Sequence, residues 1–326
     1  MEKIKKTIKQ KILITKKINN KIIKRKKIKK RCKITINEKK GFHFLSVLSV
    51  FKNESHIFEE WITHYLNEGV DHFYLIDNES TDEYLDILYK YFDKISLIKN
   101  VRPNPQPSCY TALIPNMQSE WTLICDLDEF IYSKNGYDTI RDFLYDKGYA
   151  DEEIERKQDF RQHAFKQIII PSVDFISDGI IKQPKSVIQG FTQRIADVEK
   201  QLKFTLTKSI ICTSTNDIIE CGVHNHTVMG RTVNGNLTKS LQYPHNLKAT
   251  EIFRSADNKL LNETYLKCNH YRFQSKEYFF NIKEKRGCVA FDDKSQRDID
   301  YWKHCWKMGH TKKTVEDLEL ANKKYK

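Results

Sequence analysis

The acidic triplet Asp126, Asp128 and Glu129 is the part of the sequence best suited to chemistry. It directly follows the apolar run Trp121–Cys125, which has the length and composition of a buried strand. Since successive side chains of a strand point to opposite faces, continuation of this strand would place Asp126 and Asp128 on one side. Buried carboxylates need a positive partner, and hard divalent cations prefer oxygen ligands. The spacing therefore predicts a cation site, with a charged turn of no catalytic function as the alternative.

Two earlier strands are also predicted to end in polar side chains. The apolar run Phe42–Phe51 is followed by Asn53 and Glu54, and the next predicted strand leads into Asp77 and Asn78. In a parallel sheet, ligands bind beyond the carboxyl ends of the strands. We therefore expect these groups and the acidic triplet to converge at one edge of a sheet.

The elements that must position these residues alternate between strand and helix. Apolar runs of strand length are separated by segments with helical spacing, which is typical of a doubly wound α/β sheet. After Phe130 the pattern is less regular. The predicted helices are 58–69, 83–91, 139–146 and 151–165; the predicted strands are 42–51, 71–76, 95–98, 121–125, 167–171 and 202–213.

The charge divides the chain into an N-terminal arm and a body. Residues 1–40 contain 18 Lys and Arg and 2 acidic residues, whereas residues 41–326 contain 38 basic and 41 acidic residues. The body is therefore close to neutral and lacks the basic excess that nucleic-acid binding requires. We expect 41–326 to form a single catalytic domain, because 326 residues with 39% hydrophobic content support a substantial core.

The Lys- and Ile-rich arm has three possible interpretations: a disordered tail, a helix lying on an anionic membrane surface, or a nucleic-acid arm. It lacks the continuous apolar segment of a signal peptide, and no run is long enough to span a membrane. Eight cysteines without a C-x-x-C pair indicate a reducing compartment. We therefore expect a cytoplasmic protein with peripheral membrane contact through the arm as one possibility, and four unglycosylated sequons.

The order of these motifs resembles glycosyltransferase family 2. Glu54, the segment from Asp77 to Asp82, and the acidic triplet appear in the order seen in that family. Two downstream segments, 222–226 and 269–287, resemble the branch related to glycosyltransferase family 92, a group of inverting sugar transferases. The resemblance implies a GT-A-like Rossmann-type mixed sheet flanked by helices and a nucleotide-sugar donor, with UDP as the expected nucleotide. It also implies Mn²⁺ or Mg²⁺ as cofactor.

The resemblance further assigns roles to individual residues. Asp126 and Asp128 would hold the metal that bridges the diphosphate, with one late histidine as a further ligand. Glu54, Asp77 and Asn78 would contact the nucleoside. Basic residues near the end of the matched region either close over the diphosphate or form the solvated face of a helix. The histidine candidates are His224, His226 and His270, and the basic candidates are Lys276, Lys283, Lys285 and Arg286.

Inversion requires a carboxylate that deprotonates the acceptor hydroxyl, and Asp178, Asp174 and Glu129 are the candidates for this base. The leading hypothesis is a metal-dependent hexosyltransferase that acts on a glycan, lipid or protein hydroxyl. A nucleotidyltransferase or phosphoesterase using the same carboxylates is one alternative. A non-catalytic module that binds nucleotide or glycan is another. The absence of a G-x-x-x-x-G-K-[ST] loop excludes P-loop chemistry.

Overall fold

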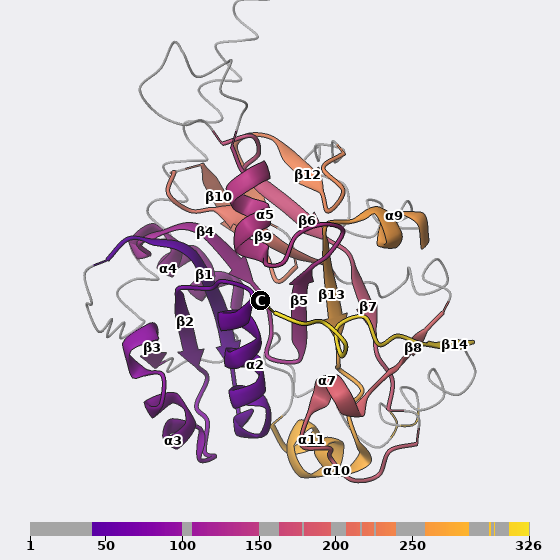
Figure 1. The fold of residues 1–326 in the computed structure, drawn as a ribbon. Coiled ribbons are helices and arrows are strands. Elements are labelled where there is room, and N and C mark those ends of the chain that lie inside the picture. The colour runs from indigo at the N-terminus through magenta and orange to yellow at the C-terminus, as the bar shows by residue number, and fades with distance from the viewer. Residues whose placement is uncertain are drawn as a thin grey trace, which may run out of the picture.

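A seven-stranded mixed sheet forms the centre of the computed structural model (Figure 1). The structure describes residues 41–99, 106–149, 163–177, 179–196, 207–215, 217–224, 226–238, 258–286, 300, 303 and 313–325. The strand order is β12 (Thr232–Asn234), β6 (Gln167–Ile170), β9 (Lys208–Cys212), β4 (Ser119–Ile124), β1 (His43–Phe51), β2 (His72–Asp77) and β3 (Ile95–Lys99). Strands β4, β1, β2 and β3 run parallel, whereas β9 is antiparallel to both β4 and β6.

Helices cover both faces of this sheet (Figure 1). The inner face of α2 (Ser55–Asn67) carries Phe58, Trp61 and Tyr65, whose helical spacing places them together in the larger core cluster. The same cluster includes side chains of α3 (Tyr84–Tyr89) and α5 (Ile140–Lys147). On the opposite face, α4 (Gln106–Leu113) and the 3₁₀ turn η2 (Ile114–Asn116) belong to a second core cluster with β1, β2 and β4. A further 3₁₀ turn, η1 (Phe92–Lys94), precedes β3.

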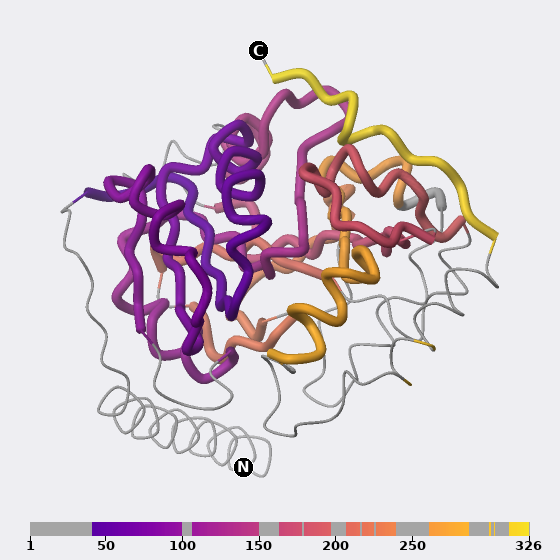
Figure 2. The backbone as a smooth tube through the Cα atoms, turned by 90° about the horizontal axis from the view of Figure 1, so that it is seen from below, coloured from indigo at the N-terminus to yellow at the C-terminus, as the bar shows by residue number. Residues whose placement is uncertain are grey.

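A three-stranded sheet continues from the end of β4. Its order is β5 (Glu129–Ser133), β13 (Leu266–His270) and β7 (Ser172–Asp174). Two small pairs complete the strands: β10 (Ile218–Cys221) with β11 (His226–Val228), and β8 (Gln193–Ile195) with β14 (Thr314–Glu316). The remaining helices are α7 (Val187–Gly190), α9 (Asn258–Glu263), α10 (Lys276–Tyr278), the π-helix η5 (Phe279–Lys283) and α11 (Glu284–Arg286). Figure 2 shows the C-terminal segment, in yellow, along the outside of the molecule.

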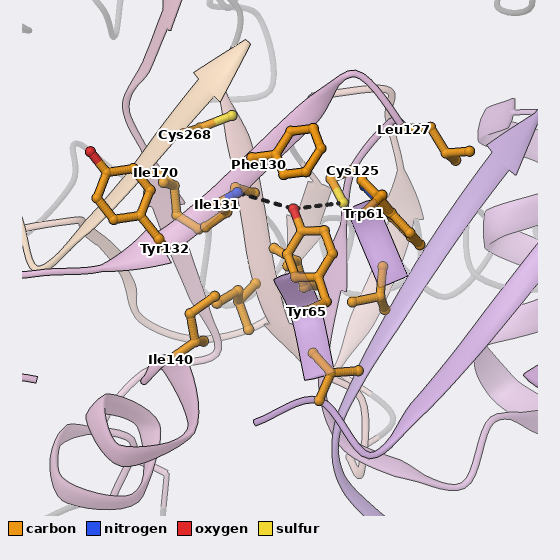
Figure 3. Packing of buried hydrophobic residues seen from close by; sticks show 14 of the residues in the cluster. Trp61, Tyr65, Cys125, Leu127, Phe130, Ile131, Tyr132, Ile140, Ile170 and Cys268 are labelled. Carbon is orange, nitrogen blue, oxygen red and sulfur yellow. Dashed lines mark hydrogen bonds between the residues drawn. The ribbon is translucent and has the colours of Figure 1, made fainter. Parts of the chain in front are cut away.

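Tyr65 connects α2 to the start of the second sheet (Figure 3). Its hydroxyl donates a hydrogen bond to the carbonyl oxygen of Glu129 at 2.9 Å and accepts one from the backbone N–H of Ile131 at 3.1 Å. The Cys125 thiol also lies 3.4 Å from this hydroxyl. The side chain is completely buried, so one phenol satisfies polar groups on both sides of the acidic triplet.

The structure confirms the predicted α/β fold class with a central mixed sheet flanked by helices. The strands predicted at 42–51, 71–76, 95–98, 121–125, 167–171 and 202–213 correspond to β1, β2, β3, β4, β6 and β9. The predicted helix 151–165 is wrong at its C-terminal end. His163 forms an isolated antiparallel β-bridge with Tyr149, and Phe165 packs against Trp121 just before β6. Residues 151–162 of that prediction lie outside the described residues.

The predicted arm, residues 1–40, also lies outside the described residues, so its three interpretations stay predictions. Among the described residues, no helix is both long enough and apolar enough to cross a membrane. Five cysteines in the described ranges are buried, where a thiol packs as a small apolar side chain.

Candidate active site

The pairing register of the second sheet brings three chemically active side chains into one row. His270, the last residue of β13, is paired with Glu129 on β5 and with Asp174 on β7. Residues directly opposite each other in a sheet point to the same face. His270 Nδ1 lies 3.1 Å from Asp174 Oδ1, and Nε2 faces the other way, 3.8 Å from Glu129 Oε1. Segments distant in sequence therefore meet where β4 ends.

Asp126 and Asp128 do not continue a strand as the sequence predicts. β4 ends at Ile124, and residues 127 and 128 form a turn in which the Glu129 N–H donates to the Asp126 carbonyl at 3.2 Å. Glu129 Oε2 also accepts a hydrogen bond from the Asp126 N–H at 2.9 Å. The two aspartates therefore have different surroundings.

Asp128 lies beside His270. The distance from Asp128 Oδ1 to His270 Nε2 is 3.5 Å, and Lys283 Nζ is 3.8 Å from Oδ2. Burial opposes ionisation of Asp128, but His270, Lys283 and Arg286 hold its pKa well below the ordinary value. Burial likewise opposes the charged form of His270, and Asp128, Asp174 and Glu129 raise its pKa to about 9.

Asp126 is engaged by two residues that the sequence analysis did not predict. Lys208 Nζ lies 3.0 Å from Asp126 Oδ2 and 3.0 Å from Glu129 Oε2, while Gln106 Nε2 donates to Asp126 Oδ1 at 2.6 Å. The register of β9 against β4 pairs Ser209 with Ile124, so Lys208 falls just beyond the end of β4. Burial would lower the pKa of Lys208, but Asp126 and Glu129 hold it well above its ordinary value.

The other carboxyl ends of the parallel strands hold Glu54 and Asp77. Glu54 is buried and forms an ion pair with Arg286, which also donates to the Lys52 carbonyl at 3.0 Å. Asp77 accepts hydrogen bonds from the Ser80 N–H at 2.8 Å and the Tyr84 hydroxyl at 2.9 Å. The Asp77 carboxylate thus orders the loop after β2.

Asn78 is buried, and its backbone N–H donates to the Phe51 carbonyl at 2.9 Å. This bond ties the ends of β1 and β2 together. The strand order β4-β1-β2 places all three predicted polar groups at one sheet edge, as expected.

The predicted basic residues divide into buried and exposed groups. Lys276 and Lys285 are exposed at the two ends of the helical segment formed by α10, η5 and α11. Lys283 and Arg286 face inwards, and Lys283 donates a short hydrogen bond to the Arg272 carbonyl. Only these inner residues belong to the charge cluster around Asp128.

Of the three candidate histidines, His270 alone lies beside a carboxylate of the acidic triplet. His224 and His226 are on the β10–β11 side, and neither Nδ1 has a hydrogen-bond partner among the described residues. Burial and the neighbouring charge of Lys208 lower the pKa of His224 to about 2 and that of His226 to about 3. Both imidazoles are therefore neutral.

The three candidate bases have different positions. Asp178 lies outside the described residues. Asp174 is buried and is 3.5 Å from Arg272 Nε through its second oxygen, so both of its oxygens face cationic groups. Glu129 is completely buried, and its Oε1 has no hydrogen-bond partner in the described part of the chain.

Asp128 and His270 are the residues that best fit a divalent cation. Within the described ranges, no three His, Cys, Asp or Glu side chains form a ready-made metal site. Asp128 and His270 nevertheless fit as a pair, because a carboxylate that holds the far nitrogen of a histidine is the usual support of a metal-binding imidazole. Mg²⁺ and similar ions are commonly held by one or two protein groups together with substrate phosphates.

Comparisons with known proteins identify the family. The family model "Glycosyltransferase family 92" matches residues 44–286, which is most of the chain. A comparison with curated proteins found no match. The chain thus combines a Rossmann-type sheet with an acidic site at its carboxyl edge, and it belongs to glycosyltransferase family 92. This confirms the predicted resemblance to the branch related to family 92.

Several solved structures are similar to part of this chain. S. aureus TarS 1-349 with UDP is 12% identical over 52% of this chain and 47% of its own, with a TM-score of 0.33. The mannosyltransferase PcManGT from Pyrobaculum calidifontis with GDP-Man and Mn²⁺ is 12% identical over 48% of this chain and 44% of its own, with a TM-score of 0.28.

Glucosyl-3-phosphoglycerate synthase from Mycobacterium tuberculosis, in complex with Mn²⁺, UDP and glucosyl-3-phosphoglycerate, is 11% identical over 53% of this chain and 57% of its own, with a TM-score of 0.29. The chain thus spans about half the length of these structures. We therefore base the proposals below on the family match and on the geometry of the site.

Proposed function

We propose that the chain is a metal-dependent glycosyltransferase that moves a sugar from a nucleotide-sugar, with UDP-sugars as the first candidates, to an acceptor hydroxyl with inversion. The observation that carries the proposal is the arrangement of Asp128, His270 and Asp174. Asp128 Oδ1 and His270 Nε2 lie 3.5 Å apart, and Asp174 holds the other imidazole nitrogen. This pair would hold Mn²⁺ or Mg²⁺. A mixed carboxylate and imidazole pair favours Mn²⁺.

The bound ion would supply positive charge where the leaving diphosphate becomes more negative. Asp174 fixes the orientation of His270 by accepting from Nδ1 and so leaves Nε2 free of a proton when the ring is neutral. The ion pair between Glu54 and Arg286 attaches the end of α11 to the end of β1. This attachment keeps the inner basic residues next to Asp128 and excludes water from that side of the site.

Inversion requires a base on the acceptor side of the sugar. Glu129 is completely buried and contacts Lys208 and the Asp126 N–H. Both oxygens of Asp174 contact His270 or Arg272. Each carboxylate therefore already holds neighbouring groups in place. We therefore favour Asp178 as the base. In sequence it follows the segment that begins with β7, whose last residue, Asp174, pairs with His270.

The test is release of nucleotide from a panel of UDP-, GDP- and TDP-sugars, with metal-free protein, with Mn²⁺ and with Mg²⁺. We expect slow, sugar-dependent release that EDTA abolishes and Mn²⁺ restores. Asp128→Asn should lower the rate about 1,000-fold, because the substitution weakens the hold on the cation that would stabilise the leaving diphosphate. Asp86→Asn, on the exposed side of α3, is the matched control and should leave the rate unchanged. Equal rates with and without metal would refute the metal-dependent mechanism.

A further inference from the structure

Lys208 is a buried cation at the centre of the acidic triplet. Its side chain is almost fully enclosed, and its ammonium group has three partners: Asp126 Oδ2 at 3.0 Å, Glu129 Oε2 at 3.0 Å and the Val223 carbonyl at 3.4 Å. An ammonium group has three donors and no acceptor. These three partners therefore use its full hydrogen-bonding capacity, and the group has little freedom to move aside.

The oxygens of Asp126 are both occupied by side chains of this protein. Gln106 donates to Oδ1 and Lys208 to Oδ2. A metal ion on Asp126 would have to displace one of these donors and would lie next to the fixed positive charge of Lys208. Lys208 itself is enclosed, so its charge is poorly screened and repels a second cation. A cation at Asp126 would therefore have to overcome this repulsion and break hydrogen bonds of 2.6 or 3.0 Å.

The acidic oxygens on the Asp128 side have longer contacts than those of Asp126. Asp128 Oδ1 faces His270 Nε2, and Glu129 Oε1 points to the same nitrogen at 3.8 Å. Glu129 Oε1 has no hydrogen-bond partner among the described residues, although its other oxygen has two. Asp128 thus has only the longer contacts to His270 and Lys283, at 3.5 and 3.8 Å, and Glu129 Oε1 is the acceptor that has no donor on this side.

We infer that Lys208 is a built-in cation that occupies Asp126 and one oxygen of Glu129, and that it thereby confines the divalent ion to the Asp128 and His270 side. The inference rests on the proposed metal-dependent function. It assigns different tasks to the two aspartates of the motif. Asp128 is a metal ligand, whereas Asp126 anchors Lys208 and the turn and does not bind metal. Lys208 is a positioning residue in this scheme.

The experiment measures Mn²⁺ binding to the full chain by electron paramagnetic resonance of the free ion, without any turnover. Wild-type protein should bind one Mn²⁺. Asp126→Asn should keep the dissociation constant within about threefold of wild type, whereas Asp128→Asn should weaken binding at least about 30-fold. Lys208→Met should bind a second Mn²⁺, because Asp126 and Glu129 then lack their internal cation. Lys90→Met, whose lysine is exposed on the surface and pairs with Glu59, is the control and should match wild type.

The outcomes separate this inference from the proposed function. If wild type binds Mn²⁺ but Asp126→Asn loses it as fully as Asp128→Asn does, the division of tasks is wrong while metal dependence stands. If Lys208→Met binds a single ion with unchanged affinity, Lys208 does not exclude metal and the inference fails. If wild type binds no Mn²⁺ even with UDP present, both proposals fail. Circular dichroism shows whether Lys208→Met is folded, and the two aspartate variants decide the question if it is not.

Discussion

Two glutamates at opposite ends of β5 are both completely buried, and their carboxylates are used differently. Glu68, which directly follows α2, contacts the C-terminal end of β5. Its Oε2 accepts from the backbone N–H groups of Ser133 and Ile140, and its Oε1 accepts from Lys323 and from the Tyr325 hydroxyl. Every acceptor position of this carboxylate is therefore used.

Glu129 begins the same strand with one oxygen saturated and the other free of donors. Oε2 accepts from Asp126 N–H and Lys208, whereas Oε1 has no partner in the described part of the chain and points to His270. An unsatisfied buried acceptor costs free energy unless something else approaches it. Burial and a lysine partner are common to both glutamates. The feature that separates Glu129 from Glu68 is an oxygen without a donor among the described residues.

The largest effect on stability is expected for Glu68→Gln. Four donors surround the two oxygens of Glu68, so the amide nitrogen of glutamine must face two of them whichever way it turns. Removing one partner of a buried ion pair costs about 3 kcal/mol. Urea unfolding should show this loss, while the rate of nucleotide release per folded molecule should stay within about twofold of wild type. Normal stability would mean that Lys323 and Tyr325 do not hold the strand in solution.

Glu129→Gln should show the reverse behaviour. Glutamine can keep its oxygen toward Asp126 N–H and Lys208 and place its amide where Oε1 has no donor, so little stability is lost. The negative charge facing His270 disappears, and kcat/KM should fall about 30-fold, or about 2 kcal/mol. Parallel unfolding and activity measurements on the two variants test the comparison directly. A stability loss equal to that of Glu68→Gln would contradict it.

The sequence was sufficient for six strands of the central sheet and for the acids, since local patterns determine both, whereas β12 and the second sheet were not predicted. Buried strands such as β1 and β4 are continuous apolar runs, and the polar residues after them fall at one edge because the strands are parallel. The position of the acidic triplet near Glu54 and Asp77 therefore follows from the sequence alone. The predicted strand-like alternation through Asp126 was wrong, since the chain turns at that point.

The partners of those acids could not be predicted, because long-range register decides them. Lys208 is 82 residues from Asp126 in sequence, and only the antiparallel pairing of β9 with β4 brings the two together. One local signal was available: Lys208 is a lone charged residue that opens the apolar stretch of β9. A charge in that position needs a buried partner. The choice of His270 over His224 and His226 likewise depends on the pairing of β13 with β5 and β7.

Tyr65 holds the first part of β5, at Glu129 and Ile131, and should affect both stability and activity to an intermediate degree. Tyr65→Phe leaves the Glu129 carbonyl and the Ile131 N–H without their partner in a dry environment. Stability should fall by about 1–2 kcal/mol, and nucleotide release should slow a few-fold, since the turn at Glu129 loses its support. Differential scanning fluorimetry and the release assay measure the two effects. Tyr89→Phe is the control, because Tyr89 is 78% exposed.

The smallest effect is expected at a partly buried ion pair, away from both ends of β5. His163 lies 3.2 Å from Glu120. Burial would lower its pKa, but hydrogen bonds to Cys212 and Glu120 raise the pKa to about 9. A pKa above the unfolded value means that the folded state binds the proton more tightly, so this stabilisation is complete below pH 6.5 and is lost as pH rises through about 9.

Wild-type protein should therefore lose about 1 kcal/mol more stability than His163→Gln between about pH 6.5 and 9.5. Urea unfolding at several pH values measures the difference. Glu68→Gln leaves this pair intact. If the pH dependence of the unfolding free energy is due to His163, Glu68→Gln should therefore retain it in full. An equal pH dependence in wild type and His163→Gln would show that His163 is neutral in the folded protein. In that case His163 and Glu120 would form a hydrogen bond without an ion pair. The comparison between Glu68 and Glu129 does not depend on this result.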